Sequence, residues 1–184
     1  MNKGRLGLAL AAATAVALAC GQGHLIVNVD IFSFMQGTGK DTITIPTIPA
    51  TLGGTVDNTP LSVQLPPGLS NSVVDTVSLT GAMVLTNTTG SGTMFVEVFF
   101  AGDSASTYSG SPAISSDTVT ITTGGPDTMH VRGNLTQVID TLFTKSKVWI
   151  GLRAHVQAGV TSITGGKGRI TALDAHVVIN DKFF

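Results

Sequence analysis

The chain has 184 residues, of which 42% are hydrophobic and only 11% are charged, and its formal net charge is −1. A chain with so little charge and no basic stripe is not expected to bind nucleic acid. It is also too apolar to be disordered. Its many Thr, Ser, Gly and Val residues predict β-sheet with a hydroxyl-rich outer face.

The first twenty residues have the organisation of a secretory signal peptide. Lys3 and Arg5 precede an apolar run over residues 6–19, and residues 17–20 read Ala-Leu-Ala-Cys. A positive start, a short apolar centre and small residues at the end are typical of such peptides. As a helix the run is about 21 Å long, shorter than the ~30 Å hydrocarbon core of a bilayer. We therefore expect export of the protein and no permanent membrane span.

Cys20 is the only cysteine of the chain. Here the sequence resembles bacterial lipoproteins, whose lipobox ends in a small residue followed by an invariant Cys. The resemblance covers this segment alone. It implies that Cys20 is acylated, that residues 1–19 are removed, and that the protein is held at the outer membrane, since Gly21 follows and not Asp. Residues 17–19 also fit the Ala-x-Ala site of ordinary signal peptidase, which would release a soluble protein.

These features predict three parts: a signal peptide over 1–19, a lipidated tether over 20–23 and a single domain over 24–184. The expected location is the cell envelope, facing the periplasm or the surface. With Cys20 lipidated the chain has no disulfide, so the fold must rest on its apolar core.

Apolar residues alternate with other residues in eight segments, which is the pattern of β-strands. These segments are 25–31, 43–45, 61–65, 73–85, 94–100, 119–121, 148–156 and 173–179. Turn residues separate them, and two pairs are expected to form hairpins, one across residues 87–92 and one across Gly165-Gly166. The segment from Gly102 to Ser116 is small and polar, and of all segments it most strongly indicates a long loop.

One short helix is predicted near residues 135–144. Asn134 suits a helix N-cap, Gln137 follows three residues later as in a capping box, and apolar residues then recur at helical spacing. The whole pattern predicts an all-β fold, an antiparallel β-sandwich of about eight strands with this helix across one end. Its layout resembles immunoglobulin-like sandwiches, without their Cys…Trp…Cys spacing. A closed barrel is the alternative, but one helix and uneven loops favour the sandwich.

The sequence holds no nucleophile elbow, zinc-binding His spacing or complete phosphate-binding loop, so no catalytic residue and no cofactor are expected. The candidate metal ligands are His155, His176 and Asp174. A two-residue turn at Gly165-Gly166 would place the two His side chains opposite each other, where they suit a divalent metal. A longer loop would instead pair Arg153 with Asp174 as an ordinary ion pair. The periodicity allows both registers, and we expect a solvated surface without a functional metal.

A possible partner surface is the outer face of the strand over 94–100. Phe95 and Phe99 flank Glu97, the only glutamate, and we expect another element to cover them. If they are exposed, they form a patch that docks a partner. Trp149 and Arg153 complete this possible partner surface. Together with Tyr108 they are also candidates for a sugar platform, because aromatic side chains supply large amphipathic contact faces, but aromatic residues make up only 5% of the chain.

The resulting hypothesis is a non-catalytic envelope lipoprotein, a structural or binding module tethered to the membrane through Cys20. The alternative is an accessory subunit docked on a membrane-bound complex of the electron-transport or photosynthetic kind. A metal-dependent hydrolase is the third hypothesis and the least favoured.

Overall fold

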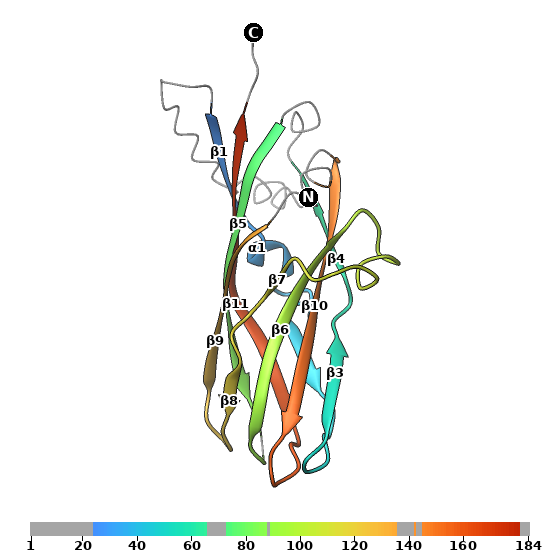
Figure 1. The fold of residues 1–184 in the computed structure, drawn as a ribbon, viewed down its shortest axis with the longest axis vertical. Coiled ribbons are helices and arrows are strands. Elements are labelled where there is room, and N and C mark those ends of the chain that lie inside the picture. Colours follow the sequence, from blue (N-terminus) through green and yellow to red (C-terminus); the bar gives the residue numbers. More distant parts are fainter. Residues whose placement is uncertain (1–23, 66–72, 88, 136–141, 143–144, 181–184) are drawn as a thin grey trace, which may run out of the picture.

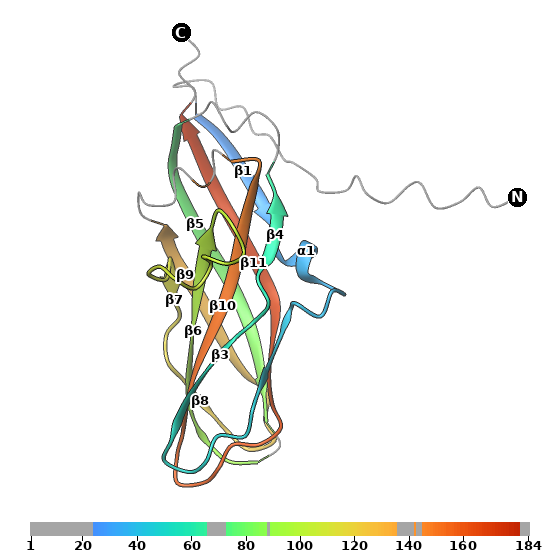
Figure 2. The same ribbon diagram turned by 90° about the vertical axis from the view of Figure 1, so that its right-hand side faces the viewer.

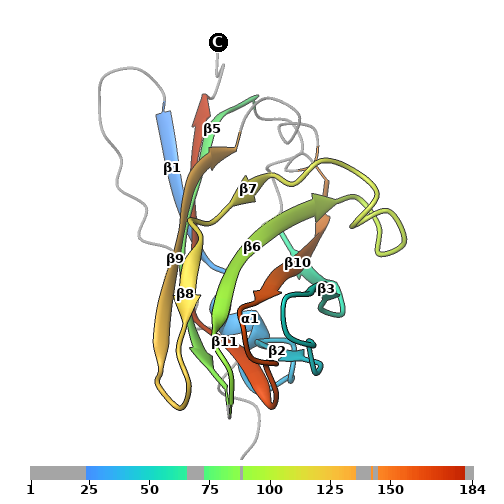
Figure 3. The same ribbon diagram turned by 60° about the horizontal axis from the view of Figure 1, so that its bottom comes forward.

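A computed structural model describes residues 24–65, 73–87, 89–135, 142 and 145–180. Within these residues the chain forms two packed antiparallel β-sheets, so the expected all-β sandwich is confirmed (Figures 1 and 3). Among the residues that the structure describes, no helix has the length and hydropathy that a membrane crossing needs.

The first sheet has five strands, and its central strand β11 is the longest strand among the described residues. The strand order is β1-β11-β5-β9, and β2 pairs with β11 on the same edge as β1. The bounds are β1 (His24–Asp30), β2 (Thr42–Ile45), β5 (Val73–Thr86), β9 (Asp127–Leu135) and β11 (Gly166–Asn180). A single helical turn, α1 (Phe32–Met35), follows β1 and buries Met35.

The second sheet has six strands (Figure 2). Its order is β3-β10-β6-β7, with β4 pairing with β10 and β8 pairing with β6. The bounds are β3 (Gly53–Asp57), β4 (Leu61–Gln64), β6 (Gly92–Ala101), β7 (Ile114–Ser115), β8 (Val119–Ile121) and β10 (Lys147–Ala158).

The core lies between the sheets and is built from the alternating apolar residues of each strand. On β5 the inward residues are Val77, Leu79, Met83 and Leu85, all buried. They belong to one continuous cluster that includes Met94, Val96 and Val98 of β6 and Leu173, Ala175, Val177 and Ile179 of β11. The inward faces expected from the sequence are therefore correct for these three strands.

Both predicted hairpins are wrong. Strand β5 pairs with β11 and β9, whereas β6 pairs with β10, so residues 87–91 connect the two sheets. Strands β10 and β11 also lie in different sheets. Alternation with a period of two shows which face of a strand is buried. It does not show whether the next strand in the sequence pairs with it in the same sheet or faces it across the core.

The start of the predicted helix is also wrong, because Asn134 and Leu135 are the last residues of β9. Pairing with Ser78 and Val77 of β5 satisfies this backbone and overrides the local capping signal. Residues 136–141 and 143–144 of that helix lie outside the described residues. Leu142 is half-buried and packs against the core.

Four connections meet at the end of the sandwich drawn at the bottom of Figure 1, which we call the tip (residues 46–52, 87–91, 122–126 and 159–165). Ile48 bridges Ile163, and the Ser91 carbonyl accepts a hydrogen bond of 2.8 Å from the Gly159 N–H. The buried Asn87 amide donates to the carbonyls of Thr89 and Gly90, at 2.9 and 2.7 Å. These contacts tie the two sheets together where the chain crosses between them.

Candidate functional site

The outer face of the six-stranded sheet carries three rows of side chains across β3, β10 and β6. In each row the three residues face one another in the antiparallel register. The rows are Asp57, Arg153 and Glu97; Thr55, His155 and Phe95; and Gly53, Gln157 and Thr93. Because side chains alternate between the faces of a strand, none of these positions contributes to the core between the sheets.

The first row contains a bidentate ion pair. Arg153 donates from Nε and Nη2 to the two carboxylate oxygens of Asp57, at 2.7 and 2.9 Å. This hydrogen-bonded partner raises the pKa of Arg153. The guanidinium carbon also lies 5.1 Å from the ring centroids of both Phe99 and Tyr108, a distance at which a cation is attracted to an aromatic face. Arg153 is thus fixed by charge on one side and by rings on the other.

The second row is organised around His155. Its Nε2 lies 2.8 Å from Glu97 Oε2, and its Nδ1 lies 3.4 Å from Thr55 Oγ1. The imidazole stacks on the ring of Phe95, with centroids 4.4 Å apart and planes 6° from parallel. From β10, His155 therefore contacts a carboxylate and an aromatic ring of β6 and a hydroxyl of β3.

The loop between β6 and β7 (residues 102–113), which we call the crossing loop, covers the upper part of this face (Figure 2). Tyr108 packs edge-on against Phe99, which is only 2% exposed. A Cβ on Gly151 would lie 2.5 Å from Thr107 Cγ2, so glycine is what lets the loop approach β10. The prediction that another element covers the phenylalanines is confirmed for Phe99.

The hydroxyl of Tyr108 anchors the crossing loop. It donates to Asn58, whose carbonyl and side-chain oxygens are both 2.7 Å away, and it lies 3.1 Å from the Leu152 N–H. Burial raises the pKa of Tyr108 to about 12. The buried Asn58 side chain also accepts from Leu152 N at 3.0 Å, so the loop, the end of β3 and the middle of β10 share one polar network.

Tyr108 is the only tyrosine of the chain, so tyrosinate absorbance reports on this hydroxyl alone. We expect the folded protein to titrate near pH 12 and the protein in denaturant near the ordinary pKa of 10.0. Because folding favours the neutral phenol, its contribution to stability is complete below about pH 10 and is lost as the pH rises towards 12. Tyr108→Phe should remove this pH dependence. A folded-state midpoint near pH 10 would show that the hydroxyl is open to solvent.

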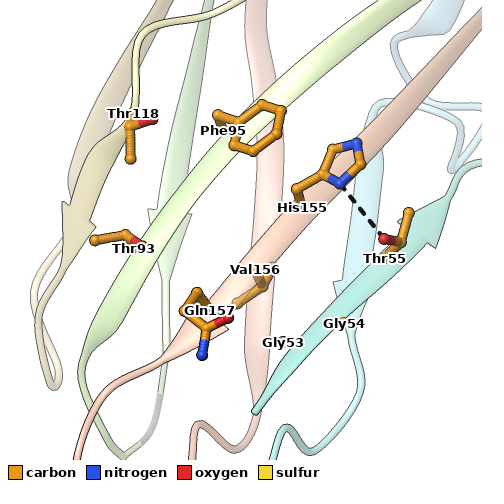
Figure 4. Close-up of a pocket in the computed structure, with 9 residues that line it drawn as sticks. All are labelled: Gly53, Gly54, Thr55, Thr93, Phe95, Thr118, His155, Val156 and Gln157. Carbon is orange, nitrogen blue, oxygen red and sulfur yellow. Dashed lines mark hydrogen bonds between the residues drawn. The ribbon is translucent and has the colours of Figure 1, made fainter. Parts of the chain in front are cut away.

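Beside the Phe95–His155 stack the face is hollowed into a groove of about 630 Å³. It is lined by Gly53, Gly54, Thr55, Thr93, Phe95, Thr118, His155, Val156 and Gln157 (Figure 4). Thr93 and Thr118 are exposed, and within the described residues neither hydroxyl has a hydrogen-bond partner. Gln157 reaches across to donate to the Thr51 carbonyl at 3.0 Å. The groove therefore offers free hydroxyls beside an ordered aromatic wall.

The candidate metal ligands do not come together. His155 lies on the six-stranded sheet, whereas His176 and Asp174 lie on the outer face of the other sheet. There His176 Nδ1 contacts Asn28 Oδ1 at 2.6 Å, and Asp174 faces Asp30. Partial burial, together with the facing carboxylate of Asp30, raises the pKa of Asp174. Both registers proposed for the last two strands are wrong, and no group of three metal-ligating side chains occurs in the described part of the chain.

The predicted partner residues do lie on one face. Phe95, Glu97 and Arg153 stand in the rows described above, Phe99 is buried under Tyr108, and Trp149 is half-buried with Lys147 Nζ 4.9 Å from its ring centroid. Sequence reasoning missed Asp57, Thr55, Thr93, Thr118 and Gln157 as site residues. The alternation of Thr55 and Asp57 with Val56 was the available signal for β3.

No family model matches the sequence, and no curated protein matches it. Two solved structures illustrate the distant structural neighbours. A structure of infectious bursal disease virus (Gx strain) has 12% identity and a TM-score of 0.43, over 93% of this chain and 38% of the viral chain. A structure of TmCBM61 in complex with β-1,4-galactotriose has 12% identity and a TM-score of 0.30, over 82% of this chain and 80% of that one. This chain thus spans well under half of the viral chain. Neither likeness carries an argument about function.

Proposed function

We propose that the protein is a lipid-anchored binding module of the cell envelope. In this proposal residues 1–19 direct export, Cys20 carries the acyl chains, and the β-sandwich presents the groove of the six-stranded sheet to a ligand. The observation that carries the binding role is the groove itself, in which free Thr hydroxyls lie beside a stacked Phe95–His155 pair. Concave sites with a few oriented polar groups beside an aromatic side chain are typical of ligand binding.

A binding role is preferred over catalysis because the acidic side chains at this face have partners. Asp57 is held by Arg153, and Glu97 is held by His155. Neither of these two carboxylates lines the groove. The contacts between these side chains fix the walls of the groove before a ligand binds. Binding is favoured because the side chains then lose little conformational entropy.

One contact favours a second candidate function, ester hydrolysis. Glu97, His155 and Thr55 form a chain in which a neutral His155 that donates from Nε2 to Glu97 would leave Nδ1 free to accept the Thr55 proton. The separation of 3.4 Å between Nδ1 and Oγ1 is longer than an ordinary O–H hydrogen bond, so the nucleophile would be weakly activated. Turnover of an activated ester that is lost in Thr55→Val and in His155→Ala would favour this candidate over pure binding.

Cys20→Ala tests the anchor. The wild-type protein should fractionate with membranes, and its mature mass should include acyl chains on Cys20, because the thiol is the acceptor in the lipoprotein pathway. The variant should be exported and recovered from the soluble fraction, since export depends on residues 1–19 and anchoring on the thiol. Intact mass spectrometry of both fractions is the measurement.

A mature terminus at Cys20 without added acyl mass would contradict the anchor and leave a secreted protein. Co-migration of the wild type with a large complex in mild detergent would instead favour an accessory subunit. Co-migration of groove variants with the complex must then be compared with that of the wild type. A subunit that docks through another face should co-migrate equally well with and without these substitutions.

A further inference from the structure

The lining of the groove carries no aspartate, glutamate, lysine or arginine. The one titratable side chain is His155, whose Nε2 lies 2.8 Å from Glu97 Oε2. Asp117 precedes Thr118 but does not line the groove. A phosphate, a nucleic acid or an acidic peptide would need a free cation here, and Arg153 is already engaged with both oxygens of Asp57. The charge of the lining therefore indicates an uncharged ligand.

The polar groups of the lining argue against a purely apolar ligand. Thr93, Thr118 and the side-chain oxygen of Gln157 have no hydrogen-bond partner within the part of the chain that the structure describes. A lipid chain lying on them would remove water from these groups without replacing its hydrogen bonds, which is costly. The ligand must therefore supply hydroxyls of its own while still offering an apolar face to the ring of Phe95. Sugar rings meet both needs, since their C–H faces pack on aromatic rings and their hydroxyls point sideways.

The groove runs across the strands. Thr118 immediately precedes β8, which pairs with β6, and the lining continues over β6 and β10 to β3 (Figure 4). Three strand spacings amount to about 14 Å, the length of a short oligosaccharide. At the β3 end, Gly53 and Gly54 leave the groove open. A Cβ on Gly53 would lie 2.8 Å from Gln157 Oε1 and would displace that side chain.

We infer that the groove binds an uncharged oligosaccharide, with a sugar ring against Phe95 and its hydroxyls on Thr93, Thr118 and Gln157. This inference rests on the proposed function, because it names the ligand class of the same groove. It assigns Asp57, Arg153 and Glu97 a positioning role, because none of these three side chains lines the groove.

The test is isothermal titration of the full-length protein, kept in a detergent that has no sugar headgroup. One panel contains neutral gluco-, galacto-, manno- and xylo-oligosaccharides, and the other contains dextran sulfate, polyphosphate and synthetic acidic and apolar peptides. The paired variant Thr93→Val/Thr118→Val removes two exposed hydroxyls at nearly constant shape. Its matched control is Thr80→Val/Thr128→Val, which makes the same change at exposed positions on the other sheet.

We expect at least one neutral oligosaccharide to bind, with an affinity that falls about tenfold or more in the groove variant and in Phe95→Ala and is unchanged in the control. Equal melting temperatures of the Thr variants will separate lost binding from lost folding. Groove-dependent binding of a charged polymer or a peptide, without binding of any neutral sugar, overturns the ligand class and leaves the binding module standing. If no member of either panel binds, or if binding ignores the groove variants, the inference and the proposed role of the groove both fail.

Discussion

Phe99→Ala should lower the free energy of unfolding by about 3–5 kcal/mol, the usual cost of truncating a buried phenylalanine. Phe99 is 2% exposed although it lies on the outer face of its sheet, because Tyr108 packs edge-on against it with centroids 5.3 Å apart. The guanidinium of Arg153 lies 5.1 Å from the same ring centroid. Truncation would leave a cavity beneath the crossing loop and remove a ring that positions Arg153.

The measurement is denaturant unfolding, with Phe34→Ala as the matched control. Phe34 lies in α1 and is 41% exposed, so its truncation should change stability by no more than about 0.5 kcal/mol. If both variants unfold like the wild type, the crossing loop does not pack on β6. The tyrosinate titration of Phe99→Ala gives an independent reading, since loosening of the loop should bring the pKa of Tyr108 down towards 10.0.

Gly90→Ala should destabilise the protein more than the same substitution at Gly37, Gly39 or Gly124, three other glycines with a left-handed backbone conformation. Gly90 has φ +86°, and a Cβ there would stand 2.1 Å from the carbonyl oxygen of Ser162, which belongs to the backbone of another connection at the tip. A backbone atom cannot rotate away as a side chain can. The loop must therefore move, and with it the bridges that join the two sheets.

Gly124→Ala is the control for Gly90→Ala. Gly124 has φ +70°, also in the left-handed region, but a Cβ there would meet nothing within 4 Å. Its substitution should cost only the conformational strain of a left-handed residue, about 1–2 kcal/mol. We expect Gly90→Ala to cost at least about 4 kcal/mol, a loss that marks a specific structural conflict. Equal effects of the two substitutions, measured by thermal or denaturant unfolding, would show that the tip adapts to the added methyl group.

The sequence alone placed part of the candidate site correctly. Strict alternation from Met94 to Phe100 put Phe95, Glu97 and Phe99 on one face of one strand, and the same rule put Arg153 and His155 on one face of another. That these two strands are neighbours is a separate fact. Because β6 and β10 pair, His155 contacts Glu97 and Arg153 contacts the ring of Phe99.

The positions of the other site residues depend on tertiary contacts that local sequence patterns do not show. Strand β3 begins with two glycines, so its local sequence resembles a turn, and only pairing with β10 makes it a strand that brings Asp57 and Thr55 to the face. Tyr108 comes from a loop whose small polar residues have no period at all. Its position depends on contacts with Phe99 and Asn58, which no local pattern predicts. The loop expected over residues 102–116 is confirmed for 102–113, whereas Ile114–Ser115 form β7.

What the sequence determined by itself is the all-β class, the inward residues of the long strands and the loop over residues 102–113, because these follow from side-chain alternation and turn chemistry within a few residues. What only the tertiary structure decided is which strands are partners. An amphipathic strand buries the same residues whether its sequence neighbour lies beside it or across the core, so burial alone cannot select between them. The two connections expected to be hairpins therefore run from one sheet to the other. As a result, His155 lies beside Glu97 and not beside His176, and the strands that line the groove are neighbours.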